Sequence, residues 1–343
     1  MAGLVSELKF LVPWGHIAAK AWGSPQGRPV LCLHGWLDNA NTFSKLIPLL
    51  PKDCYYMALD FAGHGLSSHR PAGCPYYLID HVSDVRRVAA YYANTSTALK
   101  WNRFSLMGHS MGGTVAGMFA CIFPELVDKL ILVESCGFYP SPQGYHKGPE
   151  TLRKQKASSR SITRDDISNL EEWEKILYGH RIVIDNLLNV DGKQHQALRV
   201  RSSEKALQRL LEANNDLTEE SGKILLERGA TKVPGGLVYN RDIRLLSHTS
   251  HPTHIEYQVN YVKKIQADVL MIIAQDGIFT KQSPEHLSEY SVIIQEAFRA
   301  SRKEHFQYAE VSGNHFVHLN EPEVVAGIVS TFLNNNQNLK AKL

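Results

Sequence analysis

The amino-acid sequence predicts an α/β fold with a mostly parallel sheet, helices on both faces of that sheet, and a helical insertion near the middle of the chain. Short apolar runs alternate with segments of helical spacing up to about residue 137. The same alternation returns near residue 265, after a long stretch with few strand-like runs. Strands that alternate with helices are typical of parallel sheets covered by helices. We therefore expect a core of residues 1–137 and 265–343 that carries a helical cap of residues 138–264.

The first half of the core is predicted to contain a hairpin followed by four buried strands. The hairpin is expected at residues 7–12 and 16–23. Short apolar runs that end at turn-forming residues predict the buried strands, at residues 29–35, 55–65, 103–108 and 129–135. Helical spacing predicts intervening helices at residues 43–50, 77–93 and 112–123. Each such helix can carry the chain back to the start of the next parallel strand.

The insertion is predicted to be helical, and the alternation of strands and helices resumes after it. Charged segments of helical character lie at residues 167–179, 203–214 and 218–229, and residues 235–240 form a strand-like run. Beyond the insertion, strands are expected at residues 267–277 and 305–315, and helices at residues 285–301 and 322–333. A sheet that stops and resumes around a helical block indicates one core domain with a cap.

Composition and charge disfavour several classes of function. Lys and Arg number 37 against 34 Asp and Glu, and no concentrated basic run is seen, so we expect no nucleic-acid partner. No stretch reaches the roughly 18 apolar residues of a membrane-spanning helix. The five cysteines lack the spacing of a metal site and are odd in number, which favours a reducing compartment.

The two ends of the sequence suggest where the protein resides. Residues 1–15 lack the charged start and long apolar stretch of a secretory signal, so a cytoplasmic protein is expected. The last three residues, Ala341, Lys342 and Leu343, are similar to the Ser-Lys-Leu address that directs proteins to peroxisomes. The sequence therefore predicts a cytoplasmic or peroxisomal protein, with the peroxisomal import receptor as a partner.

Ser110 is the candidate nucleophile. It stands in Gly108-His109-Ser110-Met111-Gly112, between a predicted strand and a predicted helix, which is the context of a nucleophile elbow. A strand that turns directly into a helix strains its middle residue and requires small neighbours two positions away. The hydroxyl then stands at the carboxyl edge of the sheet, where open α/β folds bind ligands. The alternative is a tight turn without chemistry.

A serine hydroxyl needs a base and an oxyanion site. His315 is the candidate base, because it follows the last predicted strand and so reaches the same sheet edge. The loop His34-Gly35-Trp36 follows an early strand, and the Trp36 amide is expected to face that of Met111 across the oxyanion. A simple strand-to-helix turn is the alternative for this loop.

Four segments in order carry a resemblance to a known family: HGWLDNANTF, LDFAGHGLSS, GHSMGG and GNHFVHLNEPE. The chain resembles the α/β-hydrolase superfamily over its whole core. Within that superfamily it looks like the serine hydrolase-like proteins, which share the HGWLDNA loop and the VPWGHIAAKAWG start. The resemblance implies an eight-stranded sheet, a cap inserted between strands six and seven, and a Ser-His-acid triad. It does not imply a substrate.

Two carboxylates qualify as the triad acid. Asp276 follows the first strand after the cap, which is the usual place in the superfamily, and it is slightly preferred for that reason. Glu134 follows the strand after the nucleophile helix, where the resembling haloalkane dehalogenases and coelenterazine luciferases carry an acid. Both residues are expected at the same sheet edge as His315.

The expected activity is hydrolysis of a carboxylic ester or thioester through an acyl-enzyme on Ser110. Dehalogenases and soluble epoxide hydrolases use an aspartate at this elbow, so the serine disfavours both activities. The mechanism needs no metal or organic cofactor. One alternative is a ligand-binding or weakly active protein on the same fold. Another is cofactor-free lyase or peroxidase chemistry at the same site.

Overall fold

The computed structural model of the 343-residue chain describes residues 5–93, 101–139, 172–192, 199–246, 254–280 and 285–335. Ala341, Lys342 and Leu343 lie outside these residues, and peroxisomal delivery stays a prediction. None of the helices in the described ranges combines the length and the apolar composition needed to cross a bilayer.

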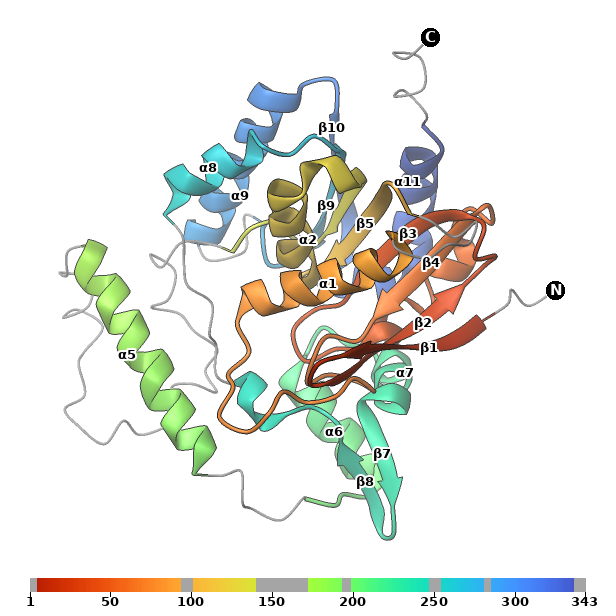
Figure 1. Ribbon diagram of the computed structural model, residues 1–343, viewed down its shortest axis with the longest axis vertical. Coiled ribbons are helices and arrows are strands. Elements are labelled where there is room, and N and C mark those ends of the chain that lie inside the picture. Colours follow the sequence, from red (N-terminus) through yellow and green to blue (C-terminus); the bar gives the residue numbers. More distant parts are fainter. Residues whose placement is uncertain are drawn as a thin grey trace.

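An eight-stranded sheet forms the centre of the molecule, with strands in the order β1-β2-β4-β3-β5-β6-β9-β10 (Figure 1). The strands are β1 (Val5–Val12), β2 (Gly15–Trp22), β3 (Arg28–Leu33), β4 (Cys54–Leu59), β5 (Phe104–His109), β6 (Val127–Val133), β9 (Asp268–Asp276) and β10 (Phe306–Asn314). Pairing is antiparallel for β1 with β2 and for β2 with β4, and parallel across the rest of the sheet. The predicted fold class is confirmed, including the insertion between the sixth and seventh strands of the sheet.

Helices cover both faces of the sheet. One face carries α1 (Leu78–Ala93), α2 (Met111–Ile122), α8 (Ile255–Val262) and α9 (Glu285–Arg302). The other face carries the 3-10 turns η1 (Ala40–Phe43) and η2 (Ile47–Leu49) and the helix α11 (Pro322–Asn334). The helix predicted at residues 43–50 is replaced by the two 3-10 turns. Pro48 lies inside that segment, and its ring excludes a continuous α-helix there.

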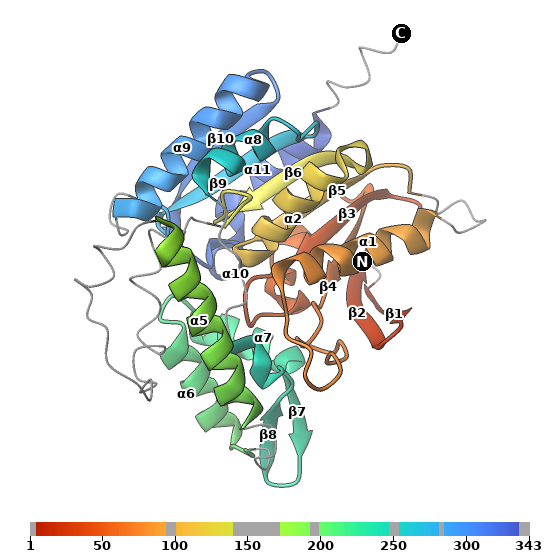
Figure 2. The same cartoon turned by 60° about the vertical axis from the view of Figure 1, so that its left-hand side comes forward.

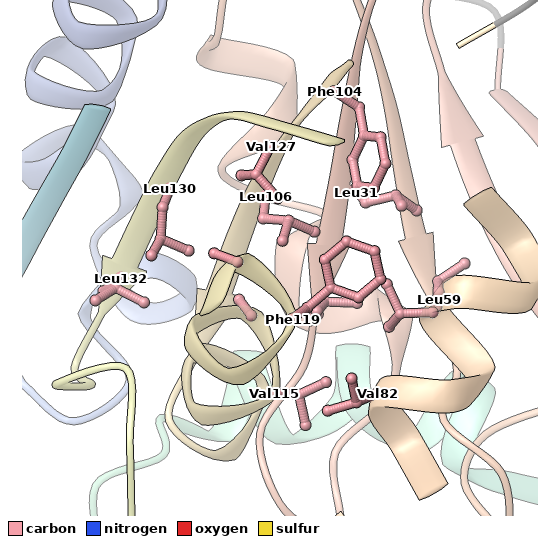
Figure 3. Packing of buried hydrophobic residues seen from close by; sticks show 14 of the residues in the cluster. Leu31, Leu59, Val82, Phe104, Leu106, Val115, Phe119, Val127, Leu130 and Leu132 are labelled. Atoms are coloured by element: carbon pink, nitrogen blue, oxygen red, sulfur yellow. The ribbon is translucent and has the colours of Figure 1, made fainter. Parts of the chain in front are cut away.

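The core consists of two apolar layers, one on each side of the sheet, because side chains alternate along each strand. Leu106 belongs to the layer under α1 and α2, whereas its neighbour Met107 belongs to the layer under α11. Phe119 of α2 points at the strands and is fully buried among them (Figure 3). Truncating such a phenylalanine to alanine costs about 3–5 kcal/mol, so this layer fixes α2, and with it the turn at Ser110.

The inserted segment adds elements at one end of the core (Figure 2). It contains α5 (Glu172–Asp191), α6 (Ser203–Ala213), α7 (Glu219–Gly229), the hairpin β7 (Ala230–Val233) and β8 (Gly236–Tyr239), and the turn η5 (Ile243–Leu246). The hairpin was expected only in part, as the run at residues 235–240. Leu210 and Leu225 of this segment pack with Phe316, next to His315. Residues 255–262, which we assigned to the cap, form α8, and this helix packs against α2 and α9 of the core.

Candidate active site

Ser110 occupies a strained turn between β5 and α2. Its φ is 52° and its ψ is −120°, a backbone conformation that residues other than glycine rarely adopt. The neighbouring glycines explain why this turn fits. A Cβ on Gly112 would lie 2.0 Å from the carbonyl oxygen of Leu33, and one on Gly108 would lie 2.4 Å from that of Gly112. The Ser110 amide donates to the Val133 carbonyl at 3.1 Å, which ties the turn to β6.

His315 follows β10 and contacts Glu134. Its Nδ1 lies 3.0 Å from Oε2 of Glu134, which is fully buried. Glu134 itself has a φ of 49°, so it stands at a second strained turn, directly after β6. The carboxylate also accepts the Ala274 amide at 2.6 Å on Oε1 and the Ile278 amide at 3.0 Å on Oε2. Glu134 thus accepts from two backbone amides and from the imidazole, and these donors hold it in one orientation.

Asp276, the slightly preferred acid, is not the carboxylate that the structure brings to His315. It ends β9, and its side chain is exposed to solvent. The next residue, Gly277, lies over Glu134 so closely that a Cβ there would be 2.3 Å from Oε2. The chain after β9 therefore folds over the Glu134 side chain. This side chain is longer than that of Asp276 and fills the place beside the His315 imidazole.

The predicted oxyanion loop lies beside the elbow, because β3 and β5 are neighbouring parallel strands. Met111 is the first residue of α2, a position whose N–H has no acceptor within the helix. Trp36 follows β3, and its indole Nε1 donates to the Leu245 carbonyl at 2.9 Å, which fixes the side chain. His34 braces the loop: its Nε2 accepts the Phe61 amide at 3.0 Å.

A buried pair, Asp38 and His109, lies beside this site and was not foreseen. His109 Nε2 is 2.9 Å from the carbonyl oxygen of His315, so that nitrogen carries the proton. Its Nδ1 faces Oδ2 of Asp38 at 3.8 Å, and neither atom has a hydrogen-bond partner among the described residues. Burial raises the pKa of Asp38 to about 7, with His315 acting in the opposite direction. The two residues stand in the quoted segments HGWLDN and GHSMGG, but nothing local to those segments shows that their side chains meet.

Burial shifts the pKa values of several other titratable groups in directions that favour their uncharged forms. Burial lowers the pKa of five of the described histidines, namely His34, His64, His81, His109 and His318. Burial also raises the pKa of Asp84, as it does that of Asp38, to about 7. Burial therefore favours the neutral form of these imidazoles and raises the pH at which the two carboxyl groups take up a proton.

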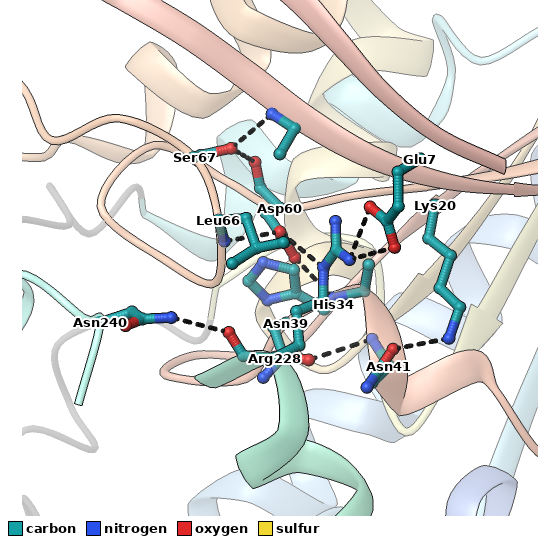
Figure 4. A network of polar contacts seen from close by, with 12 residues as sticks. Glu7, Lys20, His34, Asn39, Asn41, Asp60, Leu66, Ser67, Arg228 and Asn240 are labelled. Carbon is teal, nitrogen blue, oxygen red and sulfur yellow. Dashed lines mark hydrogen bonds and ion pairs between the residues drawn. The ribbon is translucent and has the colours of Figure 1, made fainter. Parts of the chain in front are cut away.

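The cap is joined to the core by polar contacts around Arg228 of α7 (Figure 4). The Arg228 guanidinium contacts Asp60 Oδ2 at 2.7 Å and Glu7 Oε1 at 2.7 Å. Asp60 also accepts the Ala40 amide at 2.8 Å, which links this ion pair to the turn after the oxyanion loop. Asn39 adds a direct contact, because its side-chain amide donates to the Leu225 carbonyl of α7 at 2.9 Å.

Comparison with known proteins agrees with this architecture. Residues 28–322 match the family described as alpha/beta hydrolase fold. The chain belongs to the α/β-hydrolase family. Among members of this family, it is 47% identical to "Serine hydrolase-like protein 2" of Homo sapiens, over 99% of this chain and 98% of that one. It is 45% identical to "Serine hydrolase-like protein" of Mus musculus, over 98% of each chain. The resemblance to serine hydrolase-like proteins is thereby confirmed.

Solved structures of other proteins superpose on most of the chain. A hypothetical protein from Pseudomonas aeruginosa PAO1 matches with a TM-score of 0.74 and 27% identity, over 96% of this chain and 99% of that one. A thioesterase domain from the curacin biosynthetic pathway matches with a TM-score of 0.68 and 22% identity, over 96% and 100%. These matches show the same α/β-hydrolase fold.

Proposed function

We propose that the protein is a serine hydrolase that cleaves a carboxylic ester or thioester through an acyl-enzyme on Ser110. One observation carries the proposal: His315 Nδ1 lies 3.0 Å from a buried carboxylate, at the sheet edge that also holds a strained serine turn. A carboxylate at Nδ1 keeps the proton on that nitrogen and leaves Nε2 as the base. The names of the relatives agree with a hydrolase.

The proposed reaction begins when His315 Nε2 takes the Ser110 hydroxyl proton. The serine oxygen then bonds to the substrate carbonyl carbon, and the carbonyl electron pair moves onto its oxygen. The amides of Met111 and Trp36 stabilise this oxyanion. When the intermediate collapses, the bond to the leaving alcohol or thiol breaks and His315 gives it the proton. Water, with His315 again as base, then releases the acid and restores Ser110.

The proposal is tested by labelling the purified protein with a fluorophosphonate probe and by hydrolysis of p-nitrophenyl esters and acyl thioesters of graded length. We expect labelling and turnover in the wild-type protein, and loss of both in Ser110→Ala and His315→Ala. Circular dichroism and a thermal melt show whether each variant is folded. A folded wild-type protein that neither labels nor turns over any ester or thioester overturns the proposal and favours the ligand-binding alternative.

A further inference from the structure

Two buried polar atoms beside the proposed base have no hydrogen-bond partner among the described residues. They are Oδ2 of Asp38 and Nδ1 of His109, which face each other at 3.8 Å, a separation longer than a direct hydrogen bond. The two residues are only 7% and 1% exposed. Both atoms lie next to Gly35 of the oxyanion loop, where a Cβ would be 3.0 Å from each of them. Buried polar atoms are nearly always paired, so this contact requires an explanation.

His109 touches several parts of the proposed site. It ends β5, directly before Ser110. Its Nε2 donates to the His315 carbonyl at 2.9 Å, and no other group in the described part of the chain donates to that oxygen. Its Nδ1 faces Asp38, in the turn that follows the oxyanion loop. The base is thus held at two places, by Glu134 at its imidazole and by His109 at its main chain.

The pair of Asp38 and His109 has two contacts and needs a proton for each of them. One proton lies on Nε2 of His109, toward the His315 carbonyl. The other belongs between Nδ1 and Oδ2, because two bare acceptors that face each other repel. Burial raises the pKa of the Asp38 carboxyl group to about 7, with His315 acting in the opposite direction, and burial lowers the pKa of the His109 ring. Asp38 is therefore the group that carries the second proton, as a carboxylic acid.

We propose that His109 is a positioning residue for the base, and that its contact with the protonated Asp38 keeps it in that role. Loss of one proton to solvent leaves a single ring proton for two acceptors, the His315 carbonyl and the Asp38 carboxylate. A hydrogen bond to a charged acceptor is about twice as strong as one between neutral groups. The N–H bond at Nε2 is therefore broken and one at Nδ1 is formed, so that His315 loses its main-chain donor.

The surroundings of the pair leave Asp38 as its titrating member. His318 packs against His109, with ring centroids 4.0 Å apart, and burial lowers the pKa of His318 to about 3. The pKa of His34 is lowered in the same way. Both of these rings are therefore neutral near pH 7, whereas a positive charge on His315 or Arg241 favours the Asp38 carboxylate. The titratable or charged groups that face the pair are His34, His315 and His318 and, in the small cleft that Asp38 also lines, Tyr239 and Arg241 of the cap.

This inference rests on the proposed hydrolase function, and rescue by a matched side chain tests it. His109→Leu removes the donor to the His315 carbonyl, whereas His109→Gln keeps an N–H donor at the place of Nε2 and has no group at Nδ1. With p-nitrophenyl esters, we expect kcat to fall about 10- to 100-fold in His109→Leu with KM unchanged, which is the effect of a small displacement of a catalytic group. His109→Gln should recover most of the lost rate.

His16→Leu is the matched control. The Nε2 atom of His16 lies 2.9 Å from the Leu66 carbonyl, which is the same kind of contact outside the site, and its loss should leave kcat unchanged. Circular dichroism and a thermal melt show whether each variant is folded. A folded His109→Leu with wild-type kcat overturns the positioning role, and so does a folded His109→Gln that is as slow as His109→Leu.

The pH dependence of kcat tests the part of Asp38. After subtraction of uncatalysed hydrolysis, wild-type kcat should fall on the alkaline side toward the value of His109→Leu, as the pair loses its proton. The amide of Asp38→Asn donates to Nδ1 at every pH, so this variant should keep its kcat where the wild-type value falls. An alkaline fall of equal size in both proteins, or no fall in the wild type, overturns the role of Asp38.

Nuclear magnetic resonance of the histidine rings requires no turnover and separates this inference from the hydrolase proposal. Spectra of protein with ¹⁵N-labelled histidine show which ring nitrogen carries the proton, and His109→Gln identifies the His109 signals. In the wild type we expect this proton on Nε2 at about pH 6 and on Nδ1 at about pH 9, and in Asp38→Asn on Nε2 at both.

The same spectra decide the inference if no ester is cleaved, in which case the hydrolase proposal fails. The expected shift of the proton then shows that His109 holds the His315 main chain under the control of Asp38. A wild-type proton that stays on Nε2 at both pH values overturns the role of Asp38. A proton on Nδ1 already at about pH 6 overturns the positioning role of His109.

Discussion

Replacing Glu134 by glutamine changes the hydrogen bonds at the centre of the site while it preserves the shape of the side chain. The carboxylate accepts the Ala274 amide on Oε1, and it accepts the Ile278 amide and His315 Nδ1 on Oε2. Glutamine offers one oxygen and one NH₂ group. If the oxygen takes the Oε1 place, the NH₂ group faces His315 and forces its proton onto Nε2, which can then no longer act as a base. If the oxygen takes the Oε2 place, the NH₂ group meets the Ala274 amide at about 2.6 Å, donor against donor.

Either orientation leaves buried donors unsatisfied, which lowers the free energy of unfolding by about 1–3 kcal/mol. The orientation that relieves the Ala274 contact is the one that inactivates His315. We therefore expect kcat for ester hydrolysis to fall by about 10⁴, the size of the equivalent change in other triads, which is about 5.5 kcal/mol of activation free energy.

Steady-state kinetics and the rate of fluorophosphonate labelling measure the loss, and urea unfolding measures the stability. Asp276→Asn is the matched control, because this carboxylate is exposed and is expected to change kcat less than threefold. The reasoning is refuted if Glu134→Gln keeps more than a tenth of the wild-type kcat. It is equally refuted if Asp276→Asn shows the large loss instead.

Three further outcomes are expected. Gly277→Ala should lower kcat at least tenfold, because the added Cβ would lie 2.3 Å from Glu134. Gly327→Ala is the control and should keep full activity, because its added Cβ would meet nothing within 4 Å. Equal kcat values for the two variants would contradict this prediction. Arg228→Met should lower the free energy of unfolding by about 3–5 kcal/mol, because it leaves Asp60 buried without its partner, and adding Asp60→Asn should restore part of that loss in a urea titration. Stability should also fall as pH drops below about 6.5, by roughly 1.4 kcal/mol per pH unit for each net proton taken up on unfolding. The five buried histidines cause this fall, and the three buried aspartates of raised pKa, Asp38, Asp60 and Asp84, oppose it. A free energy of unfolding that stays flat from pH 7 to pH 5 would count against neutral imidazoles in the folded core.

Local chemistry predicts the parts of the site that depend on a few consecutive residues. The turn at Ser110 follows from Gly108 and Gly112, because the steric demand and the residues that meet it lie within five positions. The alternation of strands and helices predicts the sheet in the same way, through periods that are visible in the sequence. The position of His315 at the carboxyl edge follows from the end of a parallel strand.

The choice of the acid depends on packing between distant segments. Glu134 and Asp276 end neighbouring strands, β6 and β9, so strand order alone gives both of them the same sheet edge. Two features distinguish Glu134 from Asp276: the positive φ of Glu134 and the short distance between Gly277 and the Glu134 side chain. Both features arise only when the chain has folded. The contact between Asp38 and His109 is similar, since a loop after β3 and the end of β5 meet only once the sheet has formed.

The place of Glu134 along the chain has a consequence for how this protein can diverge. The proposed nucleophile, oxyanion loop and acid all precede the insertion, and β5 and β6 are directly paired. Lengthening or exchanging the insertion therefore leaves the geometry between Ser110 and Glu134 intact. Only His315 follows the insertion in the chain and depends on the later strands for its position. An acid at Asp276 would lie beyond the insertion and would depend on it for its own placement. The inserted segment can thus vary without rebuilding the pair of residues that precedes it.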